Sequence, residues 1–290
     1  MSSAVESLRR PLGLLLSGGG ALGAWQAGAL EALSAAGLQF DKVLGFSAGA
    51  MAGATCAFGM LEDLVGFYRD ADHVRVLRFG PGLRPPRLFS SEVLWETMKP
   101  FYDDIAAKRS IKCCLTVMTL RLRDLATVYS RFTPGGIGGW DGPLAAKLVA
   151  SCAIPGIFPA VTFQERHGPA WHLDGGVRGR ELMTMQGLES CRDVLVLEMV
   201  RPEETRLRTW SPSLFFKLRG RHICRAQIDH AVSSALSGPM PPRVFRLAPS
   251  RFLDFSMLGF SSRNCVPALD LGRSDAAGFL KDPEACLAAR

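Results

Sequence analysis

The sequence predicts an α/β fold in which helices flank both faces of a central, mostly parallel β-sheet, giving three layers. An apolar run at 12–16 and a second expected strand at 40–44 are each followed by glycine and then by an alanine- and glycine-rich segment with helical spacing. A continuous apolar run is typical of a parallel strand that is covered on both faces. The order strand, helix, strand, helix within the first 58 residues therefore indicates βαβ crossovers and a parallel sheet.

The first four elements have clear boundaries. After the strand at 12–16 we expect a helix at 24–36, which Gly37 ends. The second strand at 40–44 leads into a helix at 48–58, whose small residues allow close packing under the sheet. The later expected helices lie at 62–72, 91–107, 144–152, 220–236 and 275–280. The later expected strands lie at 111–119, 126–130, 170–173, 194–200 and 244–247, and loops lie at 79–86, 135–139 and 202–212.

Length and composition are those of one large domain. The chain has 290 residues, of which 48% are hydrophobic and 21% are charged, and it contains no internal repeat or low-complexity tract. We expect residues 1–10 to form a flexible N-terminus and residues 11–290 to form a single domain.

Residues 45–49 have the sequence Gly-Phe-Ser-Ala-Gly between an expected strand and an expected helix. In that context Gly-x-Ser-x-Gly is a nucleophile elbow, in which the flanking glycines let the serine hydroxyl project from a tight turn. The glycines at 18–20 precede the first helix, where free backbone N–H groups stabilise negative charge. A candidate nucleophile, Ser47, and a candidate oxyanion site together indicate acyl transfer.

The glycine run also matches the pattern Gly-x-Gly-x-x-Gly at 18–23, which occurs in dinucleotide-binding proteins. That kind of site needs an acidic residue at the carboxyl end of the second strand to bind a ribose hydroxyl. Here the nearby acid, Asp41, lies at the start of that strand. This position disfavours a nucleotide cofactor.

A serine nucleophile needs a proton acceptor, and histidine is one candidate. The chain has five histidines: His73, His167, His172, His222 and His230. His230 lies in an expected amphipathic helix, and His222 lies among arginines that would disfavour an imidazolium. His172 precedes Asp174 by two residues and would share its face of a strand. We expect His172 to be a neighbour of the site and not the base.

Four motifs in order resemble the patatin-like phospholipase family. Besides the glycine run at 18–23 and the elbow at 45–49, they are Ala-Ser-Cys-Ala-Ile-Pro-Gly-Ile-Phe-Pro at 150–159 and Asp-Gly-Gly at 174–176. The motifs span residues 12–180. Leu22 is a departure, since many members of that family carry Arg or Lys there.

The resemblance implies a three-layer patatin-like fold and a serine–aspartate dyad without a catalytic histidine. By matching position, Ser47 is the nucleophile and Asp174 is its partner. The residues implied for the oxyanion loop are Gly18, Gly19 and Gly20. The implied reaction is hydrolysis of a phospholipid or other lipid ester through an acyl-enzyme, with no metal and no cofactor. The alternative is a catalytically weak lipid-binding or regulatory module with the same fold.

The formal charge of +7 permits contact with anionic lipid, and nothing in the sequence matches a nucleic-acid-binding motif. Residues 201–225 are rich in basic residues, with Trp210 and three large apolar residues at 214–216 interleaved. The basic residues are Arg201, Arg206, Arg208, Lys217, Arg219, Arg221 and Arg225. This composition suits an anionic membrane surface, and equally a solvated loop whose aromatic residues pack into the core.

The eight cysteines contain no C-x-x-C pair, and no Cys/His cluster has the spacing of a zinc site. No export signal is evident, and no apolar run reaches the roughly 20 residues of a membrane-spanning helix. We therefore expect reduced thiols and a cytoplasmic protein, with peripheral membrane association left open.

Overall fold

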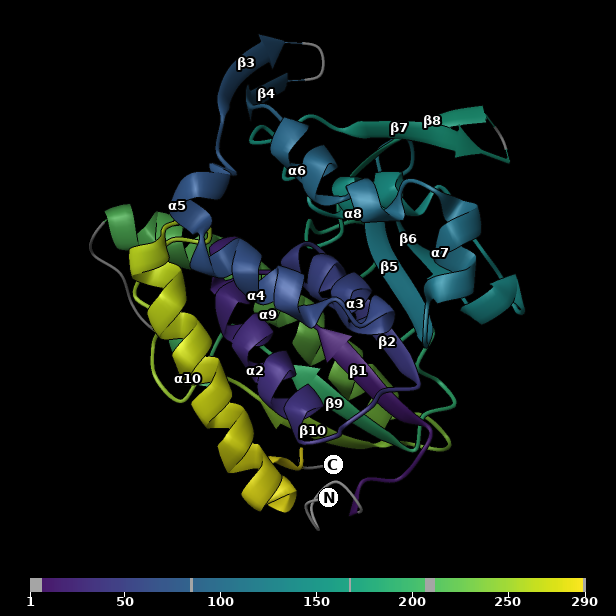
Figure 1. Ribbon diagram of the computed structural model, residues 1–290, viewed down its shortest axis with the longest axis vertical. Helices are drawn as coiled ribbons and strands as arrows, with labels where there is room; N and C mark the ends of the chain where they lie inside the picture. The colour runs from purple at the N-terminus through teal and green to yellow at the C-terminus, as the bar shows by residue number, and fades with distance from the viewer. Residues whose placement is uncertain (1–6, 84–85, 167, 207–211, 289–290) are drawn as a thin grey trace.

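A computed structural model describes residues 7–83, 86–166, 168–206 and 212–288. Its centre is an eight-stranded sheet in the order β10-β9-β1-β2-β5-β8-β7, with β6 also paired to β5 (Figure 1). The strands are β1 (Leu12–Leu16), β2 (Lys42–Gly45), β5 (Cys114–Arg121), β6 (Ala126–Phe132), β7 (Val161–Glu165), β8 (Gly168–Asp174), β9 (Asp193–Leu197) and β10 (Arg243–Leu247). The pairs from β10 to β5 are parallel, and β6, β7 and β8 join through antiparallel pairs. The predicted mostly parallel α/β sheet is confirmed.

Side chains alternate between the two faces of this sheet. Leu14 and Leu16 of β1 pack into one hydrophobic cluster, and Leu15 packs into the other, as the twofold period of a strand requires. The first cluster lies under α2, α3, α4 and α10, and the second lies under α9 on the opposite face (Figure 1). These helices are α2 (Gly23–Ala35), α3 (Ala48–Phe58), α4 (Leu61–Arg69), α9 (Pro212–Leu236) and α10 (Ser262–Lys281). Three layers result.

Several boundaries differ from the expectation. The helix expected at 91–107 is divided into α6 (Glu92–Thr97), a turn at Lys99–Phe101 and α7 (Asp104–Ser110). Pro100 lacks the N–H that a continuous helix needs, and Asp103 caps α7 by accepting from two backbone N–H groups. The helix expected at 62–72 is divided into α4 and α5 (Ala71–Val74).

Three further elements were not predicted from the sequence or were predicted to be shorter than they are. The stretch 79–86, expected as a loop, forms a hairpin of β3 (Phe79–Leu83) and β4 (Pro86–Phe89). Strand β7 was not expected. Helix α10 begins at Ser262 and contains Pro267, whereas only its last part was expected. The helix α8 (Leu144–Ser151) follows the prediction closely.

Residues 7–10 contact the body of the domain, whereas residues 1–10 were expected to form a flexible N-terminus. Leu8 is buried. The backbone N–H of Arg9 donates to Asp193 Oδ2 at 2.7 Å, and its guanidinium donates to Oδ1 at 2.9 Å. Arg10 donates to Asp41 at 2.8 Å. Residues 1–6 lie outside the described part of the chain.

The proposed membrane face at 201–225 is not supported by the side chains that are described there. Arg221 is fully buried, with Nη1 at 2.6 Å from Oε2 of Glu204. Arg225 lies 2.5 Å from Glu198 Oε2 and also pairs with Asp229. These guanidinium groups neutralise buried carboxylates and do not face a bilayer. The side chains of residues 206, 208, 210, 214–217 and 219 lie outside the described residues.

All eight cysteines are described and none forms a disulfide. Within the described ranges, no helix has the length and apolar character needed to cross a membrane.

Replacing Arg221 by glutamine should lower the free energy of unfolding by about 3–5 kcal/mol, because the Glu204 carboxylate would be left buried without its partner. Arg78→Gln is the matched control, since Arg78 pairs with Glu92 at the surface with 63% of its side chain exposed, and should change stability by less than about 0.5 kcal/mol. Urea denaturation of both variants measures the difference. Equal effects of the two substitutions would contradict the buried pair.

Candidate active site

The site is built where two strands meet on one edge of β5. β6 pairs with the other edge from Leu115 to Arg121. On the shared edge, β2 runs parallel to β5 and ends with Gly45 opposite Val117. β8 runs antiparallel and ends with Asp174 opposite Thr119. The two carboxyl ends therefore face each other, and Ser47, two residues past the end of β2, lies beside the end of β8.

Ser47 occupies a strained turn before α3. Its φ of 55° and ψ of −133° lie in a region that residues with side chains rarely adopt. A Cβ atom on Gly45 would overlap the carbonyl oxygen of Gly49, and one on Gly49 would lie 2.5 Å from the carbonyl oxygen of Ser17. Glycine at both positions therefore lets strand, turn and helix approach closely.

Ser151 fixes the elbow from a third element, α8. The backbone N–H of Ser47 donates to Ser151 Oγ at 2.9 Å, and this hydroxyl donates to the carbonyl of Met118 at 2.7 Å. Met118 lies between the points where β2 and β8 pair with β5. Ser151 is fully buried. Sequence reasoning assigned it no role, although it lies within the motif at 150–159.

Asp174 and Ser47 line the same cavity. The Oδ1 of Asp174 accepts from the N–H of Gly176 at 2.7 Å, and its own N–H donates to Ala153 at 3.0 Å. Burial raises the pKa of Asp174 from 3.8 to about 7, although the nearby Ser47 hydroxyl and the N–H of Gly176 lower it. A carboxyl with a pKa near neutrality has the strength that general-base chemistry needs at physiological pH.

The glycine loop lies against Ser47. A Cβ on Gly18 would be 2.9 Å from the Cβ of Ser47. The loop is held by Ala21, whose N–H donates to Met257 at 2.7 Å, and by Tyr68, whose hydroxyl donates to the Gly20 carbonyl at 3.2 Å. Within the described residues, no acceptor takes the N–H groups of the three loop glycines. These glycines are Gly18, Gly19 and Gly20.

The histidines that were considered as a base have other partners. His172 is fully buried, with Nδ1 at 3.0 Å from Thr119 Oγ1 and Nε2 at 3.0 Å from Glu165 Oε1. Burial lowers its pKa to about 4. His230 Nδ1 donates to a carbonyl at 2.9 Å, and His222 lies 3.4 Å from one. His167 lies outside the described residues.

Two cavities meet at Ser47. The larger has a volume of about 320 Å³ and is also lined by Asp174, Ile157 and Arg178. The other is narrow, about 30 Å³, and is lined by Gly20 and by apolar side chains. Those side chains include Met51, Phe67, Val76, Leu94, Phe158 and Phe260. An apolar wall on both sides of a serine fits a substrate with long hydrocarbon parts.

The sequence model of the patatin-like phospholipase family matches residues 14–180. The chain belongs to this family. The match covers all four motifs, from the glycine loop to the Asp-Gly-Gly turn. This patatin-like chain is therefore placed among lipid acyl hydrolases.

Among curated proteins, this patatin-like protein is similar to the uncharacterized protein YqhO of Bacillus subtilis, with 24% identity over 66% of this chain and 72% of YqhO. Among solved structures it is similar to VipD of Legionella pneumophila, with 15% identity, a TM-score of 0.46, and 94% of this chain and 67% of VipD covered. It is also similar to the ExoU–SpcU complex of Pseudomonas aeruginosa, with 19% identity, a TM-score of 0.37, and 96% and 61% covered.

Proposed function

We propose that the protein is a serine hydrolase of lipid esters in which Ser47 is the nucleophile and Asp174 is the proton acceptor. The oxyanion of the intermediate would bind the N–H groups of Gly18, Gly19 and Gly20. The observation that carries this proposal is that Ser47, at the strained turn, lines the same cavity as the buried Asp174, whose pKa is raised to about 7 by burial.

In the proposed reaction, Ser47 Oγ attacks the ester carbonyl while its proton passes to Asp174. The tetrahedral intermediate collapses to an acyl-enzyme, and the leaving alcohol takes the proton from Asp174. Water then attacks the acyl-enzyme, with Asp174 again accepting a proton. The last step regenerates the Ser47 hydroxyl and releases a fatty acid.

The environment of Asp174 supports a base without histidine. The pKa difference between 3.8 and about 7 makes its carboxylate on the order of a thousandfold more basic than an exposed one. The oxyanion donors would supply the rest of the rate enhancement, since each donor of this kind typically stabilises the transition state by about 3 kcal/mol. The uncommitted N–H groups of the glycine loop meet that need.

The cavities at Ser47 support a lipid ester as substrate, because their apolar walls suit acyl chains. The alternative, a catalytically weak lipid-binding module, would retain the same cavities. The two proposals differ in whether Ser47 reacts.

Ser47→Ala and Asp174→Asn should each lower kcat/KM for a soluble aryl butyrate by at least about a thousandfold, because each removes one partner of the proton transfer. Ser34→Ala, at an exposed position on α2, is the matched control and should retain wild-type activity. Circular dichroism verifies that the variants are folded. Wild-type rates in folded Ser47→Ala would rule out Ser47 as the nucleophile.

The pH profile of kcat/KM should have an acidic limb with an apparent pKa near 7, since Asp174 accepts a proton only when ionised. Below that pH the rate should fall about tenfold per pH unit. His172→Gln should leave the limb in place, because His172 bonds to Thr119 and Glu165 and its pKa is lowered to about 4. A profile that stays flat down to pH 5, or a limb lost in His172→Gln, would contradict the assignment.

A further inference from the structure

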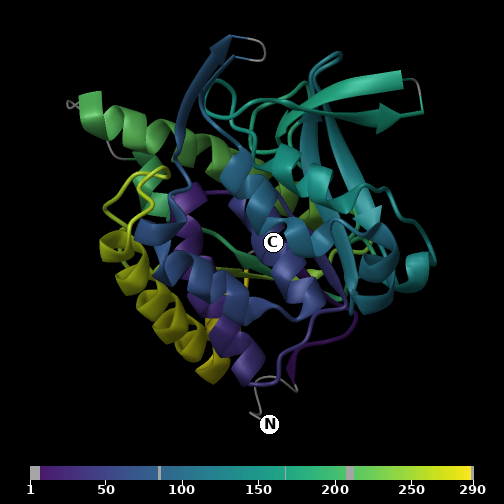
Figure 2. The ribbon, with the colours of Figure 1, turned by 45° about the horizontal axis from the view of Figure 1, so that its top comes forward.

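The β3–β4 hairpin projects from the body of the molecule, apart from the central sheet (Figures 1 and 2). It exposes large apolar side chains: Phe79 is 74% exposed, Leu83 is 89% exposed and Leu88 is 49% exposed. Single exposed apolar residues are common, but several on one projecting element mark an interaction surface.

The hairpin is poorly suited to bind another β-strand. The two strands pair with each other, and β4 also bridges to Gly156, so that its outer edge is partly occupied. Strand β3 contains Pro81 and a register shift between Phe79 and Gly82. Proline at an edge removes the N–H that an added strand would need. The partner must therefore accept apolar side chains without pairing to a backbone.

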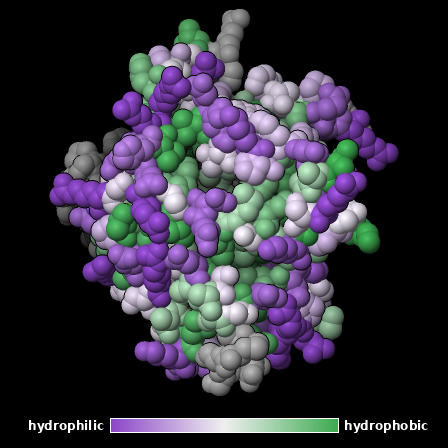
Figure 3. Space-filling model, in the orientation of Figure 1, coloured by the Kyte–Doolittle hydropathy of each residue, from purple (hydrophilic) through white to green (hydrophobic). Residues whose placement is uncertain are grey.

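The charge around the hairpin is positive. Residues 73–91 contain four arginines, at 75, 78, 84 and 87, and no aspartate or glutamate. Arg75 and Arg78 are exposed, although Arg78 has a surface ion pair with Glu92 at 2.8 Å. Apolar and hydrophilic residues lie next to each other at the projecting end (Figure 3). Apolar side chains flanked by arginines are complementary to an anionic lipid surface.

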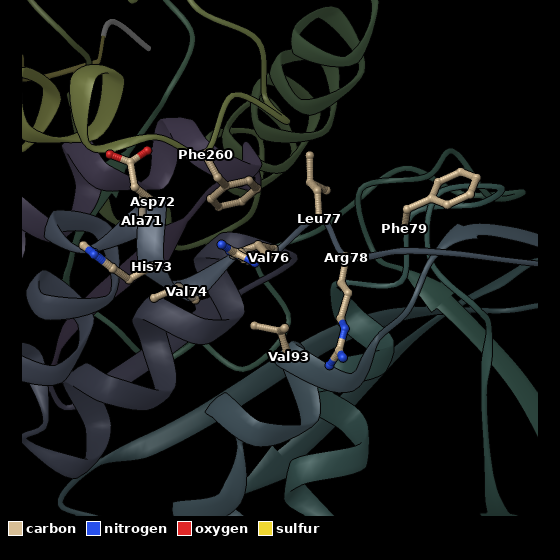
Figure 4. Close-up of a pocket in the computed structure, with 11 residues that line it drawn as sticks. Ala71, Asp72, His73, Val74, Val76, Leu77, Arg78, Phe79, Val93 and Phe260 are labelled. Carbon is tan, nitrogen blue, oxygen red and sulfur yellow. The ribbon is translucent and has the colours of Figure 1, made fainter.

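A groove of about 680 Å³ lies at the base of the hairpin, lined by residues 71–79, Val93 and Phe260 (Figure 4). Val76 and Phe260 line this groove and also the narrow apolar pocket at Ser47. These two side chains are thus common to the walls of the surface groove and of the pocket that contains the candidate nucleophile.

The second strand of the hairpin is joined to the wall of the site. The backbone N–H of Phe89 donates to the carbonyl of Ile157 at 2.9 Å, and the ring of Phe89 lies 6.4 Å from that of Phe158. Ile157 lines the larger cavity at Ser47, and Phe158 lines the narrow one. The hairpin therefore has a fixed position relative to both cavities.

We propose that the β3–β4 hairpin docks the protein on an anionic phospholipid bilayer, with the groove at its base turned toward the lipid. The docking is independent of catalysis, whereas the delivery of an acyl chain to Ser47 rests on the function proposed above. This surface replaces the one predicted at 201–225.

Sedimentation with vesicles tests the docking in the Ser47→Ala background, so that no lipid is consumed. Vesicles contain phosphatidylserine and phosphatidylcholine in equal parts. Leu83→Ser should weaken binding by about tenfold or more, because its side chain would no longer enter the apolar layer. Ile137→Ser is the matched control, since Ile137 is 86% exposed on a different loop, and should bind like its parent.

Arg75→Gln with Arg78→Gln should weaken binding to these vesicles by about tenfold or more and leave weak binding to pure phosphatidylcholine unchanged.

In the active protein, Leu83→Ser should lower the ratio of the rate on vesicle phospholipid to the rate on a soluble ester, and Ile137→Ser should not. Failure to hydrolyse any ester refutes only the proposed function. No sedimentation of the parent protein, or equal losses in Leu83→Ser and Ile137→Ser, refutes the docking proposal.

Discussion

The geometry of the site depends on one edge of β5, which pairs with the ends of two strands of opposite direction. Because β2 and β8 both end there, Ser47 and Asp174, which are far apart in the sequence, line one cavity. Met118 lies at the junction, where its carbonyl accepts from Ser151, and Ser151 in turn accepts from the backbone of Ser47. A buried polar group left unpaired at this point would destabilise the turn. The hydrogen bonds of Ser151 and Met118 therefore form one network with the candidate site.

Burial links this network to the proposed chemistry. The walls that bury Asp174 raise its pKa to about 7, and the walls at Ser47 that would receive an acyl chain are also apolar. A more solvated site would leave the carboxyl a weaker base and would offer less apolar surface to a lipid. One physical property, the low polarity of the pocket, would therefore serve both the proposed lipid binding and the proposed proton transfer.

Motifs that depend on local backbone geometry were predictable from the sequence. The elbow at 45–49 requires glycines where backbones nearly touch, and the helix at 48–58 follows directly from it. Long-range pairing was not predictable. Arg221 and Arg225 have the same local sequence character as surface residues, and only the fold shows that Glu204 and Glu198 neutralise them in the interior. Likewise, proline and glycine at 79–86 indicated a loop, whereas Phe79 and Phe89 pair across a hairpin.

Activation of a nucleophilic Ser47 by Asp174 can be tested by reacting the folded protein with a fluorophosphonate and locating the adduct by peptide mass spectrometry. We expect one phosphonylated residue, Ser47, with labelling strongly slowed in Asp174→Asn. An adduct on another serine, or no adduct on folded protein, would contradict it.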